Sequence, residues 1–240
     1  MLKAKALTVL ALVAAPGVAL ATPNGWSGDF GLGYIASSGN TKNSTANAKL
    51  GLIYTQNVWK NTFLATALGT SSNSVSTGEQ YGIADKQAYD FTPDDYVFGS
   101  VEWTKDLKGP IERRFVEAVG YGRHVLSGPE HFLDLEAGVG ARQETVNNAA
   151  EDKNNNLIGR FGAKYGWKIS ETTHFSEALK IESGRSDTFT ESVTELKVNV
   201  VGNLFAGLSY TLRNNSKVPV GAKKTDTITA LNLSYAFGAK

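Results

Sequence analysis

The sequence predicts an all-β protein, an antiparallel up-and-down transmembrane β-barrel of about 12 strands. Apolar residues alternate with small or polar ones along nearly the whole chain, which is the two-residue period of strands that have one lipid-facing side. Tight turns alternate with longer polar connections, and an export signal stands before the first strand. These observations predict where the protein resides more firmly than what it does there.

The export signal occupies the beginning of the chain. Two lysines precede an apolar run from Ala6 to Ala15, and a small-residue site follows at residues 19–21. We expect cleavage after this site, which makes residues 1–21 the signal peptide and residues 22–240 the barrel domain. No segment offers the roughly 20 continuous apolar residues of a spanning helix, so a helical inner-membrane protein is not expected.

The composition excludes several kinds of chemistry. The chain has no cysteine, so it can form neither a disulfide nor a thiolate metal site. Its formal net charge is +1, which gives no reason to expect a nucleic-acid partner. The glycine-rich pieces at residues 31–33 and 120–122 lie within expected strands and do not open a helix, so they do not indicate a nucleotide site. We expect no cofactor and no metal.

The last strand shows the alternating pattern best. Between residues 227 and 237 one face carries large apolar side chains and the other carries small or polar ones. The strands expected on this basis are Trp26–Ala36, Ala46–Tyr54, Trp59–Leu68, Gln80–Phe91, Tyr96–Lys105, Arg114–Val125, Phe132–Arg142, Leu157–Trp167, Phe175–Glu182, Glu191–Val200, Leu204–Arg213 and Thr227–Phe237. Their even number is that of single-chain bacterial outer-membrane barrels.

The connections between these strands fall into two alternating classes. The tight turns are Gln56–Asn57, Thr92–Asp95, Ser127–Glu130, Ile169–Thr172 and Val201–Asn203. The longer polar connections are Ser37–Ser44, Thr70–Glu79, Asp106–Arg113, Gln143–Asn156, Ser183–Thr190 and Asn214–Asp226. An up-and-down barrel with short periplasmic turns and longer outer loops is expected to show this alternation. Both termini then lie on the periplasmic side.

Aromatic residues cluster beside the tight turns, as expected for a girdle at the level of the lipid headgroups. The residues concerned are Trp26, Tyr54, Trp59, Phe91, Tyr96, Trp167 and Phe237. Trp103 and Phe115, which flank an outer loop, would belong to the opposite girdle. A soluble sheet with an aromatic core is the alternative, but it has no reason to alternate its loop lengths.

Two carboxylates do not fit the apolar face. Glu177 shares the lipid-facing side of its strand with Leu179 and Ile181, where a charge is costly. A bulge, a different register or a protein contact could each account for it. Glu117 raises the same question closer to the outer interface.

Ionisable side chains of both signs fall on the inward faces. The candidate lining of a pore or polar core is Lys49, Lys60, Lys86, Arg114, Asp134, Glu136, Arg142, Arg160, Lys164, Lys180, Glu182, Glu195 and Lys197. Opposite charges could pair and fill the interior, or enough water could remain for a narrow pore whose basic excess on the eighth strand favours anions. About 8 strands give a filled interior and about 16 to 18 an open channel, so about 12 strands favour a filled or narrow interior over a wide pore.

Enzyme activity is the weaker hypothesis. Histidine is the usual general base, and His124, His131 and His174 lie near tight turns on different hairpins. Ser127 follows His124 closely, but a turn serine beside a strand-end histidine is more often structural. We therefore expect an envelope structural protein or narrow channel without catalytic residues. The alternatives are a lipid-modifying enzyme of the outer membrane and a surface-binding barrel.

Several motifs resemble those of one family. They are Trp26–Gly28, Ser38–Thr41, Leu133–Gly138, and Asn214–Pro219 followed by Gly221 and Lys224–Asp226. Through them the chain resembles the DUF481 family of Gram-negative outer-membrane proteins, the YdiY-like group described as salt-induced, over essentially its whole length after the signal peptide. The resemblance implies an outer-membrane, porin-like barrel and no catalytic residues.

An outer-membrane location predicts several partners. We expect a monomer that contacts outer-membrane lipid and lipopolysaccharide. Periplasmic chaperones and the barrel-assembly machinery would act during its biogenesis. Barrels of this kind typically end on an aromatic residue that the machinery reads, whereas here Gly238–Lys240 follow Phe237.

Overall fold

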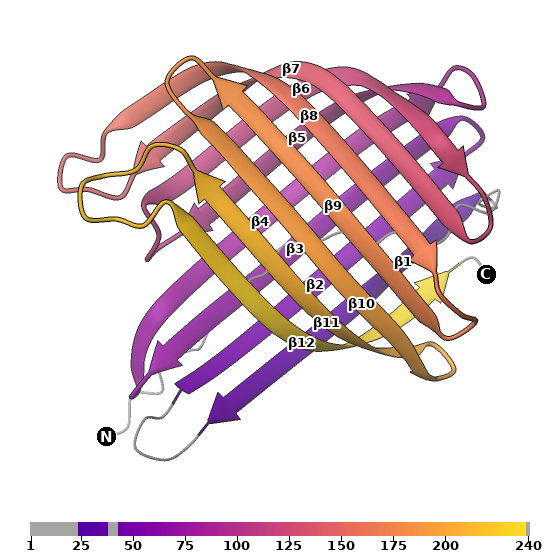
Figure 1. Ribbon diagram of the computed structural model, residues 1–240, viewed down its shortest axis with the longest axis horizontal. Helices are drawn as coiled ribbons and strands as arrows, with labels where there is room; N and C mark the ends of the chain where they lie inside the picture. The colour runs from indigo at the N-terminus through magenta and orange to yellow at the C-terminus, as the bar shows by residue number, and fades with distance from the viewer. Residues whose placement is uncertain (1–23, 38–42, 239–240) are drawn as a thin grey trace.

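The computed structural model describes residues 24–37 and 43–238, so the expected signal peptide lies outside the described residues. The predicted fold class is confirmed: twelve antiparallel strands form one closed sheet in which β1 pairs with β12 (Figure 1). The strands are β1 (Gly25–Ser37), β2 (Asn43–Gln56), β3 (Trp59–Ser72), β4 (Val75–Asp90), β5 (Asp95–Asp106), β6 (Ile111–Ser127), β7 (His131–Val146), β8 (Lys153–Lys168), β9 (Thr173–Gly184), β10 (Thr188–Val201), β11 (Leu204–Asn215) and β12 (Thr225–Gly238). No helix in the described part of the chain has the length and apolar character needed to cross a membrane.

Alternate residues of each strand point to opposite sides of the sheet. On β12, Leu231, Leu233 and Tyr235 are about half exposed on the outer surface, whereas Ala230 and Ser234 are buried inside. The predicted pattern therefore assigns the two faces of this strand correctly. Because the sheet closes on itself, its ladders can satisfy backbone hydrogen bonds that the acyl chains of lipid cannot.

The predicted outer loops are too long. The expected connection Thr70–Glu79 contains only a two-residue turn at residues 73–74, both with positive φ, because β3 and β4 extend up to it. The expected connection Gln143–Asn156 shrinks to residues 147–152. The longest connection in the described part of the chain is residues 216–224. Polar residues continue a β-ladder as well as apolar ones do, so composition does not mark where a strand ends.

The two ends of the barrel are named by their connections. The tight-turn end carries residues 57–58, 91–94, 128–130, 169–172 and 202–203. The loop end carries residues 73–74, 107–110, 147–152, 185–187 and 216–224. Both Gly25 of β1 and Gly238 of β12 lie at the tight-turn end.

The aromatic girdle at the tight-turn end is largely as predicted. Trp26 packs on Tyr54 and Trp59 on Tyr89, each pair with ring centroids 4.9 Å apart on the outer surface. Tyr96 is the exception, because its side chain points into the lumen and is only 3% exposed. The prediction placed Tyr96 by its distance from the turn, but the two-residue period puts it on the inward face.

Glu177 lies on the lipid-facing side of β9 in an undisturbed register. Its carboxylate accepts hydrogen bonds from Ser192, at 2.7 Å, and from Thr194. Both hydroxyls belong to the outward face of β10, and Glu177 is directly opposite Thr194 in the ladder. Of the three explanations considered, the structure shows a protein contact, made by the neighbouring strand β10. Glu117 is exposed on the outward face of β6.

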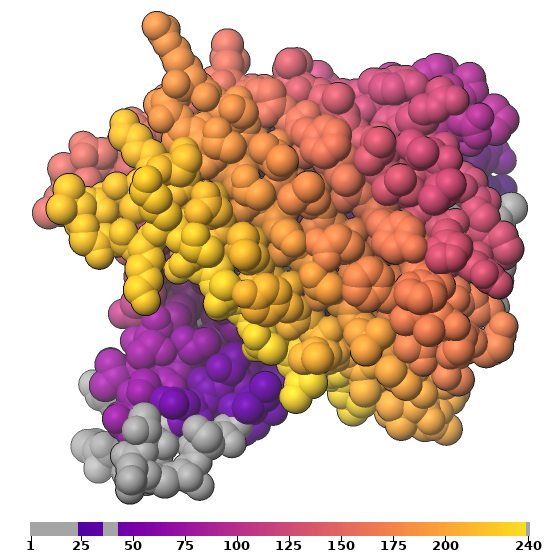
Figure 2. Space-filling view, in the orientation of Figure 1, coloured from indigo at the N-terminus to yellow at the C-terminus, as the bar shows by residue number. Residues whose placement is uncertain are grey.

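The cylinder is not closed along its full height. β12 and β1 are paired near the tight-turn end and diverge toward the loop end (Figure 1). Figure 2 shows the surface hollowed between the yellow β12 and the purple strands from the beginning of the chain.

Candidate functional site in the barrel lumen

Charged side chains from seven strands and one loop meet inside the loop-end half of the barrel. We call this set the loop-end network: Glu102, Arg114, Arg142, Glu144, Arg160, Lys180, Glu182, Asp187, Glu191 and Arg213. Its members come from β5 through β11 and from the loop between β9 and β10. Some of the ion pairs join neighbouring strands, and those of Glu102 and the Arg142–Glu182 pair link strands that are not neighbours in the sheet.

Glu102 of β5 forms ion pairs with two cations, Arg160 of β8 and Lys180 of β9. One of its oxygens lies 2.6 Å from a guanidinium nitrogen of Arg160, and the other lies 2.6 Å from Nζ of Lys180. Nζ of Lys180 also lies 3.3 Å from Glu191, whose second oxygen is 2.6 Å from Nε of Arg213. The result is a continuous chain of alternating charges from β8 to β11.

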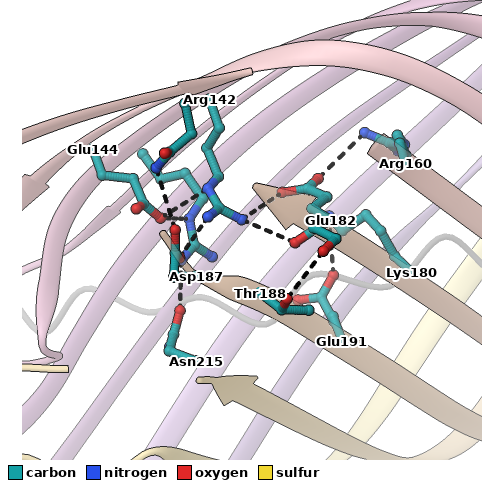
Figure 3. Close-up of polar contacts among 12 residues, drawn as sticks. Arg142, Glu144, Arg160, Lys180, Glu182, Asp187, Thr188, Glu191 and Asn215 are labelled. Carbon is teal, nitrogen blue, oxygen red and sulfur yellow. Dashed lines mark hydrogen bonds and ion pairs between the residues drawn. The ribbon is translucent and has the colours of Figure 1, made fainter. Parts of the chain in front are cut away.

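Arg142 and Glu182 form the buried centre of the network (Figure 3). Both side chains are completely inaccessible to solvent. The guanidinium of Arg142 lies 3.4 Å from Glu144 and 3.7 Å from Glu182, and it also donates to Asp187. A buried charge is tolerated only when it is paired in this way, because removing an ion from water costs several kcal/mol.

Two further contacts cross the lumen almost from wall to wall. Arg114 of β6 donates to the side-chain oxygen of Asn215 on β11 at 2.6 Å, and its guanidinium stacks 3.8 Å from the ring centroid of Phe189. Arg213 of β11 donates to Gln80 of β4 at 2.8 Å. The vestibule left among these residues at the loop end has a cavity volume of only about 70 Å³.

Half of this network is absent from the sequence-based candidates. The residues missed are Glu102, Glu144, Asp187, Glu191 and Arg213. Glu144 was assigned to a loop, because β7 was expected to end at Arg142, whereas Asp187 does lie in a loop, where the two-residue period of a strand says nothing about direction. Glu102 and Glu191 do follow the inward period of β5 and β10, so the same alternation that selected Glu195 could have found them.

A different arrangement occupies the tight-turn half. The tight-turn cluster comprises Lys60, Lys86, Tyr96, His124, Asp134, Glu136 and Lys164. Glu136 accepts hydrogen bonds from Lys86 and, at 2.7 Å, from the Tyr96 hydroxyl. The ammonium of Lys86 also lies 4.6 Å from the ring centroid of Phe98, a cation–π contact.

Glycines on β6 make room for these inward aromatic rings. A Cβ atom at Gly122 would overlap the ring of Tyr96, and one at Gly120 would overlap the ring of Phe98. These two glycines, which the sequence analysis placed within a strand, therefore serve packing. This packing holds Tyr96 in line with Glu136.

Lys60 and Lys164 are the unneutralised cations of the tight-turn cluster. Within the described residues, no carboxylate lies within 4.0 Å of either ammonium. His124 is paired instead with Asp134, at 2.7 Å through Nδ1, and its Nε2 lies 3.8 Å from Asp90. These two lysines are therefore the cations of this end that have no ion pair in the described part of the chain.

The three remaining candidates, Lys49, Glu195 and Lys197, form a quartet with Asp29 between the two regions. Lys49 lies 3.9 Å from both Asp29 and Glu195, while Lys197 lies 3.3 Å from Asp29 and 4.0 Å from Glu195. These residues belong to β1, β2 and β10, so the quartet also spans the lumen. Its charges balance, and it adds no net field.

Several buried polar atoms in the lumen have no hydrogen-bond partner among the described residues. They include both carboxylate oxygens of Glu182, Nε of Arg160 and Nζ of Lys49. Buried polar atoms of this kind are normally satisfied by ordered water. Among the described residues, no three His, Asp or Glu side chains converge as a metal site requires.

Comparisons with known proteins agree with this architecture. The sequence profile described as "Protein of unknown function, DUF481" matches residues 30–237. The uncharacterized protein YdiY of Escherichia coli (strain K12) is 30% identical over 213 residues, which cover 88% of this chain and 83% of YdiY.

Solved structures share the fold at low sequence identity. The COG4313 outer membrane channel from Pseudomonas putida F1 superposes with a TM-score of 0.57 at 12% identity, covering 94% of this chain and 100% of the channel. The NanC porin superposes with a TM-score of 0.51 at 11% identity, covering 88% of this chain and 99% of the porin.

Proposed function

The chain belongs to the DUF481 family, whose description assigns no activity, and we propose that it is an outer-membrane β-barrel that acts as a narrow, charge-lined channel without catalytic activity. The observation that carries this proposal is the loop-end network. Its side chains reach each other at 2.6 Å across the lumen, which leaves a cavity of about 70 Å³ and no wide passage.

The composition of the network favours a restricted path over an inert core. An interior meant only to be filled is more stable when it is apolar, because buried ion pairs often stabilise less than well-packed hydrophobic residues. Here the lumen instead retains unsatisfied polar atoms on Glu182 and Arg160. Lumen side chains that keep some exposure, such as Arg160, can exchange contacts with small ions and water, as groups in channel constrictions do.

The tight-turn cluster supports a preference for anions. Lys60 and Lys164 face the lumen at the end where solutes from the periplasm would enter, and neither has an ion pair among the described residues. Unpaired cations in a narrow lumen raise the local concentration of anions and lower that of cations.

Planar-bilayer recording tests the proposal. The purified barrel is expected to give small, steady unitary currents, with a reversal potential in a salt gradient that indicates anion preference. Arg185→Gln, a change at an exposed loop residue, is purified in the same way and should give the same currents. Persistent silence in correctly folded protein contradicts the channel and favours a purely structural barrel.

The location and processing of the chain belong to the same proposal. We expect the protein in the outer-membrane fraction, with a mature N-terminus at Thr22. N-terminal sequencing of the fractionated protein checks both points. Recovery of folded protein from the periplasm without detergent contradicts the assignment.

The surroundings of the histidines support the absence of catalysis. Both ring nitrogens of His124 face carboxylates, those of Asp134 and Asp90, so no nucleophile stands at either nitrogen. His131 bonds through Nδ1 to the Tyr165 hydroxyl at 2.8 Å. The variants His124→Ala and His131→Ala should leave membrane-lipid turnover unchanged in cells that express the protein. A loss of turnover specific to one variant contradicts this part of the proposal.

A further inference from the structure

The ladder that closes the barrel is incomplete. β1 and β12 pair from Ser27 opposite Gly238 to Leu32 opposite Leu233. β1 then continues to Ser37, paired only with β2, and β12 begins as early as Thr225, paired there only with β11. At the loop end, two strand edges therefore face each other without forming a ladder.

Gly33 marks the point at which the two strands separate. A Cβ atom at this position would overlap the backbone oxygen of Leu231, so the two backbones are still in contact there. Beyond Gly33 the strands diverge, and Figure 2 shows the resulting hollow between yellow β12 and the purple strands. We call this hollow the seam cleft; residues 34–37 of β1 and 225–231 of β12 form its sides.

The seam cleft lies within the membrane. A strand tilted by about 40° rises about 2.5 Å per residue along the barrel axis. From the girdle residue Phe237, Leu231 is then about 15 Å and Ile228 about 23 Å above the tight-turn interface, inside an apolar band about 25 Å tall. With the loop end outside, the cleft opens into the outer leaflet.

The cleft has apolar surfaces and an aqueous neighbour. Ile228 of β12 packs against the buried Leu68 of β3 at its base, and exposed Tyr34 and Leu231 form its lips. The vestibule adjoins it, because Asp226 at the start of β12 is one of the residues that line both. Water from the vestibule can therefore reach strand edges that lipid alone would leave unsatisfied.

Positive charge gathers beside the cleft. The loop at residues 216–224, which leads directly into β12, carries exposed Lys217, Lys223 and Lys224. Lysines at this height face the headgroup region, where each attracts anionic lipid. The combination of an apolar cleft and a basic rim fits an amphiphile that has an acyl chain and a negatively charged headgroup.

We propose that the seam cleft is a lateral gate through which an acyl chain of an anionic outer-leaflet lipid enters the barrel wall and reaches the vestibule. The lysines of residues 216–224 hold its headgroup. The gate closes by extending the existing ladder, since the register places Tyr34 opposite Leu231 two steps beyond the last pair. A second copy of the chain is a poorer occupant, because a twofold interface would bring two sets of these lysines together.

Labelling at single cysteines tests whether lipid enters the cleft. The chain has no native cysteine, so Ile228→Cys and Ser234→Cys each carry one fluorophore. Both positions are inward on β12, but only position 234 lies in the paired stretch. In lipid nanodiscs, a quencher attached to acyl chains should quench the label at position 228 at least about twofold more than that at 234. Equal quenching overturns the proposal, as does a dimer in which position 228 is shielded from lipid.

Locking the gate tests whether opening is needed for lipid binding. Oxidation of the pair Tyr34→Cys with Leu231→Cys would extend the ladder, whereas the control pair Leu32→Cys with Leu233→Cys joins residues that are already opposite. Native mass spectrometry then counts retained phosphatidylglycerol. The first disulfide should lower retention several-fold and the control should not. Equal retention in the two oxidised proteins overturns the proposal.

The basic rim is tested without altering the barrel wall. Lys223→Gln combined with Lys224→Gln should weaken phosphatidylglycerol retention on the order of tenfold and leave phosphatidylcholine retention unchanged. An unchanged preference for phosphatidylglycerol contradicts the headgroup assignment and overturns the proposal. The outcome is independent of conductance, so a silent bilayer recording and a failed lipid assay remain distinguishable.

Discussion

The two halves of the lumen handle buried charge in different ways. In the loop-end network every cation is paired with a carboxylate, Glu102 reaches Arg160 and Lys180 three and four strands away, and Arg142 and Glu182 are fully buried. In the tight-turn cluster, Lys60 and Lys164 have no such partner among the described residues, and aromatic rings fill much of the space. Under the proposed channel function, the first region would restrict the lumen and the second would influence which ions enter it.

This difference has a physical basis. An ion pair across the lumen links distant strands. When one partner is removed, the other charge stays buried without a counter-charge, and its desolvation is no longer compensated. An unpaired lysine beside water loses little when it is neutralised. Substitutions should therefore change stability at the loop end and selectivity at the tight-turn end.

The largest effect is expected from Arg142→Ala. This change leaves Glu182 and Glu144 buried without their shared guanidinium, and it should lower the free energy of unfolding by about 3–5 kcal/mol. Urea unfolding of the protein in liposomes measures the loss. Arg185→Ala, at an exposed position of the neighbouring loop, should change the same quantity by less than about 0.5 kcal/mol. Equal free energies of unfolding for the two variants would contradict the expectation that a charge in the network contributes more to stability than an exposed one.

Glu102→Gln should have the next largest effect. Arg160 and Lys180 lose the carboxylate they share, which costs about 1.5–3 kcal/mol of stability. The freed side chains no longer span the lumen, so unitary conductance should rise and anion preference should increase. Exposed Glu151→Gln is the matched control. An unchanged conductance in folded Glu102→Gln would mean that the network does not limit the path.

Tyr96→Phe probes the aromatic part of the tight-turn cluster. It removes the hydroxyl donor 2.7 Å from Glu136 but leaves Lys86 in place, so the expected loss is about 1 kcal/mol. Tyr235→Phe, which faces lipid on β12, should cost less. Should both variants unfold at the same urea concentration, the Glu136 contact contributes nothing measurable.

The smallest change in stability is expected from Lys60→Gln combined with Lys164→Gln. Because neither ammonium has an ion pair among the described residues, the free energy of unfolding should shift by less than about 0.5 kcal/mol. The reversal potential in a salt gradient should nevertheless move toward cations. The control, Lys153→Gln with Lys217→Gln, removes two exposed lysines of the loop end. An anion preference that survives in the lumen variant would place the selectivity elsewhere.

Sequence reasoning was strong where a property depends on neighbouring residues of one strand. The alternation in residues 227–237 assigned Leu231 and Leu233 to lipid and Ser234 to the interior. It also placed Glu177 on the lipid face, where the structure finds it. It was weaker at strand ends: the connection Thr70–Glu79 became a two-residue turn, and Glu144 was missed for the same reason.

The partners of the charged residues were not accessible from the sequence. Nothing local indicates that Arg160 pairs with Glu102, three strands away, or that Arg114 reaches Asn215 on the opposite wall. Such contacts depend on the number of strands and on the accumulated stagger of every ladder around the barrel. An error of one residue in the register of any strand pair would change all of these contacts.

The sequence by itself determined the class of fold, the number of strands and the face to which most side chains belong, because a two-residue period is a property of each strand alone. Only the tertiary structure decided which loop-end charges meet, that the inward Tyr96 reaches Glu136 and that β1 leaves β12 at Gly33. Those features arise when the sheet closes on itself, since closure brings distant strands to a common axis and fixes where the first and last strands can meet.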